Sequence, residues 1–189
     1  MVENNIERFG LRLKVDTDFE LVNPDSDPRF NALWSHYHEL MERRGVSVEY
    51  AKREVRRRTT LIGALLLKMG DADGMICGTY GMHHLHLAFI EDVLGRQPNV
   101  SKCYTLNLLN LPGRTIFLAD TYVTYDPTPA QLVEMTVLAA EEMRRFGVEP
   151  RVALLSHSSF GTAESPTADK MREALRLLHE PHPDRKSVV

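Results

Sequence analysis

The run Val152-Ala153-Leu154-Leu155 leads directly into a small polar segment that extends from Ser156 to Ser165. A continuous apolar run of this kind is typical of a strand that is buried on both faces in an α/β protein. Loops at the carboxyl ends of such strands are where open α/β sheets bind ligands. The pattern therefore predicts a buried strand followed by a candidate ligand-binding loop.

Two predicted helices flank this strand, and each opens with the same pair of signals. Thr128-Pro129 and Ser165-Pro166 place a capping hydroxyl before a proline at the first helical position. Residues 103–111 and 115–123 have strand-like composition and are joined by Pro112-Gly113, a dipeptide that favours a type II turn. We expect these two runs to form an antiparallel pair on which the first of the two helices packs.

The first half of the chain is predicted to be mainly helical. Apolar spacing and cap or stop signals indicate helices at 6–9, 30–41, 47–57, from 59 onward, and at 82–94. The pair Asp27-Pro28 is expected to start the second of these helices, and the helix from 59 is expected to be buried. Short strands are predicted at Phe19–Val22 and Met75–Cys77. The alternation of strands and helices predicts an α/β protein, a three-layer α/β/α fold with a mixed sheet.

Composition narrows the class of protein. The 189 residues are 43% apolar and 26% charged, with a net charge of −3 and two cysteines. This composition is typical of a folded chain. The small negative net charge produces no positive electrostatic field that would attract nucleic acid. No apolar run reaches the roughly 18 residues that cross a bilayer, and the N-terminus has no secretory signal. We therefore expect a cytoplasmic protein with no membrane or nucleic-acid partner, and two reduced, buried thiols.

The turn Gly78-Thr79-Tyr80-Gly81 is a candidate phosphate cradle, because it precedes a predicted helix whose N–H groups attract anions. A tight connection without a ligand is the alternative. The first turns of that helix contain three histidines, His83, His84 and His86. The positive end of the helix dipole there favours neutral imidazole rings. These rings could line a cleft or be ordinary surface histidines. No metal site is predicted, since no acidic or thiol partner stands at ligand spacing.

The loop Ser156-His157-Ser158-Ser159-Phe160-Gly161 offers hydroxyls, amides and a glycine that suit a phosphate or pyrophosphate. It lacks the GxSxG pattern of a hydrolase nucleophile, and a loop that satisfies its own backbone is the alternative. The basic run Lys52–Arg58 could hold a polyphosphate or an acidic partner, or it could be a solvated helix face that complements a helix C-terminus. Asp120, beside the second strand of the pair, is expected to orient its loop and not to bind a metal.

Three segments together resemble the phosphotransacetylase (phosphate acetyl/butyryl transferase) family. They are Met69-Gly70-Asp71-Ala72-Asp73-Gly74-Met75, Ile116-Phe117-Leu118-Ala119-Asp120 and Glu149-Pro150-Arg151-Val152-Ala153-Leu154-Leu155-Ser156. Finer details, such as Ile76-Cys77-Gly78-Thr79 and Leu155-Ser156-His157-Ser158-Ser159-Phe160-Gly161, are similar to the version of this domain fused behind a bacterial hybrid NADP-dependent malic enzyme. The resemblance spans nearly the whole chain.

The resemblance implies a truncated two-lobed domain of the isocitrate/isopropylmalate dehydrogenase type. Its first lobe would lie in residues 1–96, and a second, dimerising lobe in 97–189. It implies an acetyl-CoA cleft lined by the following residues: Gly78, Thr79, Gly81, His83, Ser156, His157, Ser158 and Gly161. NADP and a divalent metal would belong only to a separate malic enzyme domain. A homodimer or higher homo-oligomer is expected.

Departures from the family pattern argue against catalysis by this chain. The family's phosphate-binding arginine is absent from Met82–Ala88, Thr124 stands where the family usually has Asn, and no counterpart of the family's C-terminal Ser-Arg pair is present. We therefore expect an inactive, regulatory acetyl-CoA-binding fragment whose parent oxidatively decarboxylates malate to pyruvate with NADP. The alternatives are a phosphate acetyltransferase, which moves acetyl between coenzyme A and phosphate, and a dimerisation module with an empty cleft.

Overall fold

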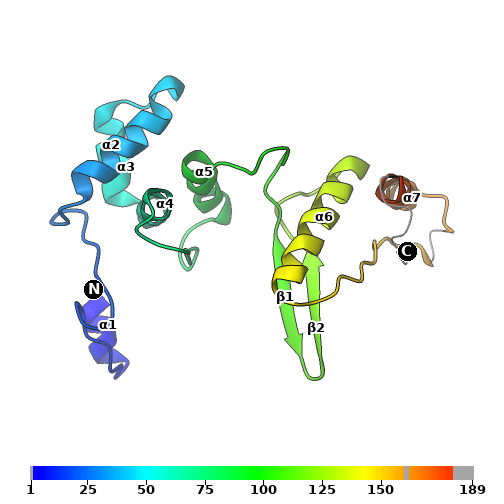
Figure 1. The fold of residues 1–189 in the computed structure, drawn as a ribbon, viewed down its shortest axis with the longest axis horizontal. Helices are drawn as coiled ribbons and strands as arrows, with labels where there is room; N and C mark the ends of the chain where they lie inside the picture. The colour runs from blue at the N-terminus through cyan, green and yellow to red at the C-terminus, as the bar shows by residue number, and fades with distance from the viewer. Residues whose placement is uncertain (1, 160–161, 181–189) are drawn as a thin grey trace. The chain divides into compact units, whose positions relative to one another are not determined.

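The computed structural model describes residues 2–159 and 162–180. The chain divides into two compact units, Met1–Gly95 and Arg96–Val189. The described elements are, in order: α1 (Val2–Arg8), α2 (Phe30–Met41), η1 (Glu42–Arg44), α3 (Val48–Arg57), α4 (Thr59–Met69), α5 (His83–Leu94), β1 (Leu106–Leu111), β2 (Arg114–Ala119), α6 (Pro129–Arg145) and α7 (Pro166–His179). This mixture of helices with a small antiparallel sheet is consistent with the predicted α/β class (Figure 1).

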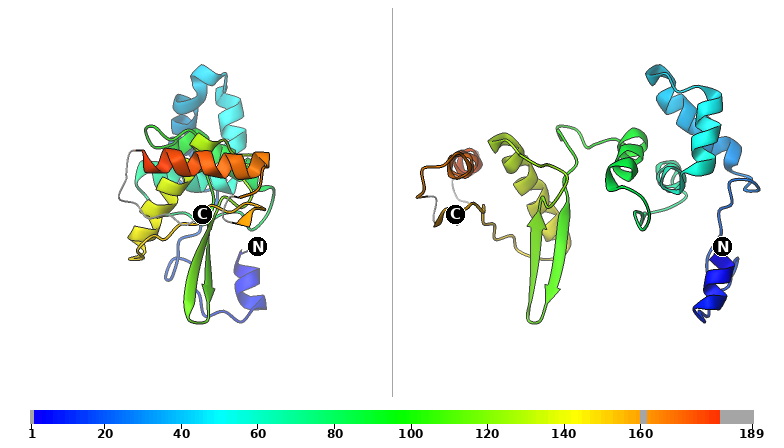
Figure 2. Two further views of the ribbon diagram at one scale, coloured as in Figure 1. Left: turned by 90° about the vertical axis from the view of Figure 1, so that its right-hand side faces the viewer. Right: turned by 180° about the vertical axis from the view of Figure 1, so that it is seen from behind.

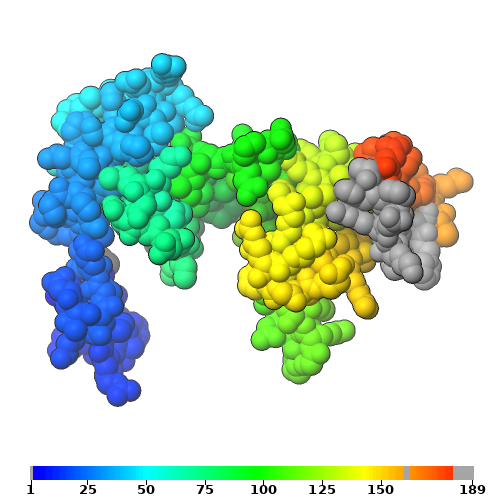
Figure 3. All heavy atoms as spheres, viewed as in Figure 1, coloured from blue at the N-terminus to red at the C-terminus, as the bar shows by residue number. Residues whose placement is uncertain are grey.

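The first unit is built on the packing of α2, α3, α4 and α5. Its core gathers the buried apolar faces of these helices: Leu33, Tyr37, Met41, Ala51, Val55, Leu61, Ile62, Ala64, Leu65 and Val93. Five residues of α4 are buried, which confirms the prediction for that helix. By contrast, α1 has no buried residue, and Figure 3 shows this blue segment projecting away from the other helices of the unit.

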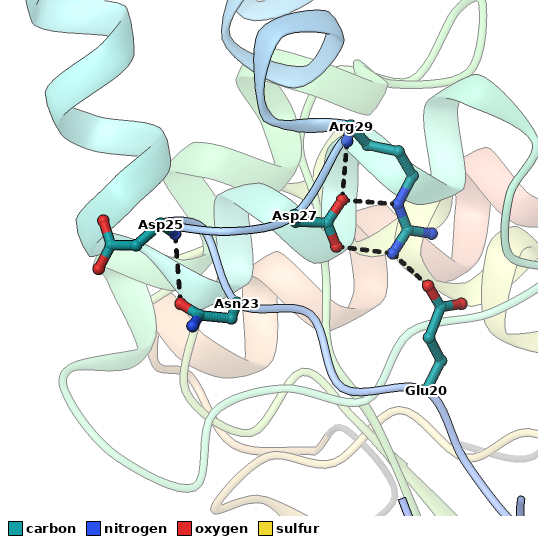
Figure 4. Close-up of polar contacts among 5 residues, drawn as sticks. All are labelled: Glu20, Asn23, Asp25, Asp27 and Arg29. Carbon is teal, nitrogen blue, oxygen red and sulfur yellow. Dashed lines mark hydrogen bonds and ion pairs between the residues drawn. The ribbon is translucent and has the colours of Figure 1, made fainter. Parts of the chain in front are cut away.

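Helix α2 covers the predicted residues 30–41, but the Asp27-Pro28 pair does not start it as expected. Its N-cap is Arg29, whose side chain makes no capping bond. The Asp27 carboxylate accepts instead from Arg29, from the backbone N–H at 2.8 Å, from Nε at 3.0 Å and from Nη2 at 2.9 Å (Figure 4). The same Nη2 donates to Glu20 Oε1 at 2.6 Å. The side-chain bond from Arg29 holds the pKa of the Asp27 carboxyl below its usual value. This turn, closed by its own side chains, replaces the predicted cap.

The second unit contains the predicted hairpin. Strands β1 and β2 pair antiparallel from Leu106 opposite Ala119 to Leu111 opposite Arg114. Gly113 has φ +78°, as the third position of a type II turn requires. Helix α6 packs against β2 and against α7 (Figure 2). The capping box of α6, with Thr128 and Gln131 bonded reciprocally to backbone N–H groups, confirms the predicted helix start.

The other predicted strands do not form among the described residues. Among the described residues only β1 and β2 form a sheet, so the expected mixed sheet is not present there. Met75–Cys77 is irregular, with Ile76 and Cys77 exposed, which also corrects the expected burial of that thiol. Residues 152–155 alternate between half-buried and exposed positions instead of being covered on both faces. Phe19–Val22 contributes only the bridge from Val15 to Phe19. An apolar run becomes a strand only when another strand accepts its backbone hydrogen bonds.

Candidate functional site

The predicted glycine turn lies between α4 and α5 in the first unit, and both glycines adopt backbone angles that other residues rarely reach. Gly78 has φ +97° and Gly81 has φ +103°. A Cβ atom at Gly81 would lie 3.2 Å from His86 Nε2, whereas a Cβ at Gly78 would meet nothing within 4 Å. Gly81 is therefore required both by its backbone conformation and by the close approach of the His86 ring.

His86 ties this turn to the start of α4. Its Nε2 lies 2.8 Å from the carbonyl oxygen of Tyr80, and its Nδ1 lies 2.6 Å from Thr60 Oγ1. Because a carbonyl can only accept, Nε2 carries the proton, and in the neutral ring Nδ1 accepts from the Thr60 hydroxyl. The ring is thus held at both nitrogens and fixes the distance between the turn and α4.

A cavity of about 180 Å³ opens beside this bridge. It is lined by the start of α4, the glycine turn and one face of α5: Arg57, Arg58, Thr59, Thr60, Tyr80, Gly81, Met82, Leu85, His86 and Phe89. Of the four site residues predicted in this unit, only Gly81 lines the cavity. Gly78, Thr79 and His83 do not, and the His83 ring lies edge-on to His84 at a centroid distance of 5.8 Å.

Three apolar residues that line the cavity, Met82, Leu85 and Phe89, are not among the predicted site residues. A usable signal was present, because Met82, Leu85, His86 and Phe89 follow the i, i+3, i+4, i+7 spacing of one helical face. That spacing predicts a helix with one apolar face, but it does not predict a cavity beside that face. Only the position of α4 shows that this face borders a cavity.

Two arginines of the basic run Lys52–Arg58 lie at the same cavity. Arg57 and Arg58 line it, at the end of α3 and the start of α4. Arg58 donates through Nε to Glu54 Oε2 at 3.2 Å, and its guanidinium carbon lies 5.8 Å from the centre of the Phe89 ring. Arg57 makes no ion pair or hydrogen bond with the residues that the structure describes. The two features considered separately in the sequence, the basic run and the glycine turn, therefore meet at one site.

The loop after residue 155 satisfies part of its own backbone. Ser156 Oγ accepts from the N–H of Ser158 at 3.2 Å, and Ser158 Oγ accepts from the N–H of Ala163 at 2.8 Å. His157 is exposed. Gly161, the remaining predicted contact, lies outside the described residues. These local bonds are the ones expected of a self-satisfied loop, and ligand binding by this loop stays a prediction.

Asp120 orients the loop after β2, as predicted. Its carboxylate accepts from the backbone N–H groups of Tyr122, Val123 and Thr124, at 3.3, 3.2 and 2.8 Å. It also accepts from the Thr105 hydroxyl. Burial acts to raise the pKa of Asp120, but the hydrogen bonds from Thr105 and the backbone outweigh it and lower that pKa. Thr124 Oγ1 is buried with no hydrogen-bond partner in the described part of the chain.

Comparison with known proteins identifies the family. Residues 1–188 match the family model described as phosphate acetyl/butaryl transferase. The chain belongs to this family. Its relatives include an NADP-dependent malic enzyme of Salmonella typhimurium, 48% identical over 97% of this chain, and that of Escherichia coli, 46% identical over the same share. A phosphate acetyltransferase of Nitratidesulfovibrio vulgaris is 33% identical over 91% of this chain.

The family fold is also seen in a solved structure. EutD phosphotransacetylase from Staphylococcus aureus matches with a TM-score of 0.78 at 22% identity, over 97% of this chain and 54% of that one. The chain therefore shares the fold of a phosphotransacetylase. It spans 24% of the length of each of the three curated relatives named above. Within residues 2–159 and 162–180, no helix has the length and apolar character needed to cross a bilayer, and no cluster of side chains is arranged to hold a metal ion.

Proposed function

We propose that this member of the phosphate acetyl/butyryl transferase family is a regulatory domain that binds acetyl-CoA without transferring the acetyl group. The malate chemistry, oxidative decarboxylation to pyruvate with NADP and a divalent metal, would belong to a separate domain of a malic enzyme. The similarity to two NADP-dependent malic enzymes over 97% of the chain supports this association. A homo-oligomer in the cytoplasm and a two-lobed architecture of the isocitrate dehydrogenase type belong to the same proposal.

The observation that carries the proposal is a cavity beside the glycine turn, next to a helix start that contains no arginine. Residues 82–88 read Met-His-His-Leu-His-Leu-Ala, which contains no arginine at the place where the resemblance leads us to expect a phosphate-binding one. The neighbouring glycine turn nevertheless keeps its left-handed backbone angles, and Gly81 borders a cavity. Acetyl-CoA is proposed to contact the predicted residues of the first unit, Gly78, Thr79, Gly81 and His83.

Regulation sets a further physical requirement. Acetyl-CoA can change malate turnover only if it binds one conformation of the protein better than another, because equal affinity for both shifts no equilibrium. The effect on malate turnover must therefore saturate at the same concentration as acetyl-CoA binding to this domain.

Calorimetry and turnover test the proposal together. We expect saturable acetyl-CoA binding by the 189-residue chain, no acetyl phosphate formed from acetyl-CoA and phosphate, and altered malate oxidation by a malic enzyme that carries this domain. No heat of binding from a folded chain would overturn the proposal and favour a dimerisation module. Unchanged malate turnover at saturating acetyl-CoA would remove the regulatory role.

The second candidate is phosphate acetyl transfer, which the 33% identity to a phosphate acetyltransferase favours. It requires this chain to make acetyl phosphate by itself. Formation of acetyl phosphate that is abolished by Ser156→Ala, in a protein that still folds, would reverse the order of the two candidates.

A further inference from the structure

We infer that the cavity beside the glycine turn is a subsite for a phosphate group, with Arg57 and Arg58 as its cationic anchors. The inference deepens the proposed function, since coenzyme A carries a phosphomonoester and a pyrophosphate on its nucleotide end. It is supported by the size, the charge and the backbone polarity of the cavity.

Size limits the ligand to a small group. The cavity volume of about 180 Å³ is below the ~300–1,000 Å³ of sites that enclose a whole drug-sized ligand. A phosphate with part of its hydration shell fits this volume, and the rest of a larger ligand would extend outside it.

Charge selects an anion. Two arginines, Arg57 and Arg58, are among the lining residues, and no acidic side chain lines the cavity. Glu54 engages Arg58 only through Nε, so both terminal guanidinium nitrogens of Arg58 make no hydrogen bond with the described residues. Arg57 makes none at all with those residues. One guanidinium group can donate two parallel hydrogen bonds to two oxygens of a phosphate. This bidentate contact is the strongest that arginine makes with phosphate.

Backbone polarity points the same way. Helix α4 begins at Thr59 and α5 at His83, and the N-cap side chains, Arg58 and Met82, make no capping bond. Both N-caps line the cavity, so the positive ends of two helix dipoles adjoin it together with the two arginines. The bridge from Thr60 through His86 to Tyr80 holds these two helix starts at a fixed separation.

Calorimetry with three probes tests the subsite: inorganic pyrophosphate, acetyl-CoA and pantetheine, which has no phosphate. We expect the first two to bind and pantetheine not to bind measurably. Arg57→Gln removes an exposed side chain, so the variant should fold normally. It should raise the Kd of pyrophosphate and of acetyl-CoA about tenfold or more, the range of one lost charged hydrogen bond.

Arg56→Gln is the matched control, because Arg56 belongs to the same basic run but does not line the cavity. It changes the net charge equally and should shift either Kd less than about twofold, as expected of a screened surface charge. Equal weakening by both variants, or by neither, would overturn the subsite. If acetyl-CoA binds and Arg57→Gln leaves its Kd unchanged, the subsite is wrong and the proposed function stands. If only pyrophosphate binds, with the Arg57 dependence, the subsite stands and the proposed function fails.

Discussion

Replacing Gly81 by alanine should destabilise the first unit more than the same change at Gly78. Both glycines have similar positive φ angles, +103° and +97°, so each alanine carries a similar backbone penalty of about 1–2 kcal/mol. Only the Cβ at position 81 meets His86 Nε2, at 3.2 Å. Relief of that contact moves a ring whose hydrogen bonds to Tyr80 and Thr60 contribute about 1 kcal/mol each. Gly81→Ala should therefore cost about 1–2 kcal/mol more than Gly78→Ala.

Urea unfolding followed by Trp34 fluorescence measures this difference. Trp34 is the single tryptophan of the chain and packs against the core of the first unit, so its signal reports that unit. In a His86→Ala background the extra cost of Gly81→Ala should disappear, because the clashing ring is gone. Equal losses for the two glycine variants in the wild-type background would refute the reasoning, and so would an extra cost that persists without His86.

Two further predictions concern burial and capping. Burial raises the pKa of Tyr37 to about 12, above its value of 10.0 in an exposed side chain, so the unfolded state loses this proton first and stability should fall as pH rises from 10 to 12. Tyr37→Phe should flatten that part of the pH dependence of urea unfolding, and an unchanged slope would contradict the assignment. Thr128→Ala removes the side-chain acceptor of the α6 capping box and should cost about 1 kcal/mol, with faster amide hydrogen exchange at Gln131. Unaltered exchange at Gln131 would show that the cap does not protect this turn.

Local signals in the sequence determined the helices and the hairpin of this protein. The cap at Ser47, the proline after Thr128 and the glycine at 113 each act within a few residues, and the structure forms the expected helix starts and turn at all three. The same signals were too weak at Asp27, because an arginine two residues away competes for its carboxylate. Capping depends on which nearby donors form hydrogen bonds with the side-chain oxygen, and the type of the capping residue alone does not specify that.

Tertiary structure decided the strands and the site. The apolar run at 152–155 has strand composition, but only Ala153 takes part in a β-bridge, and no strand among the described residues pairs with the run. In the same way, the sequence contained the basic run, the glycine turn and a helical face with His86, without any sign that they border one cavity. Short-range patterns therefore fix the helices and turns, whereas pairing and cavity formation depend on contacts between residues far apart in the chain, which only the packed helices supply.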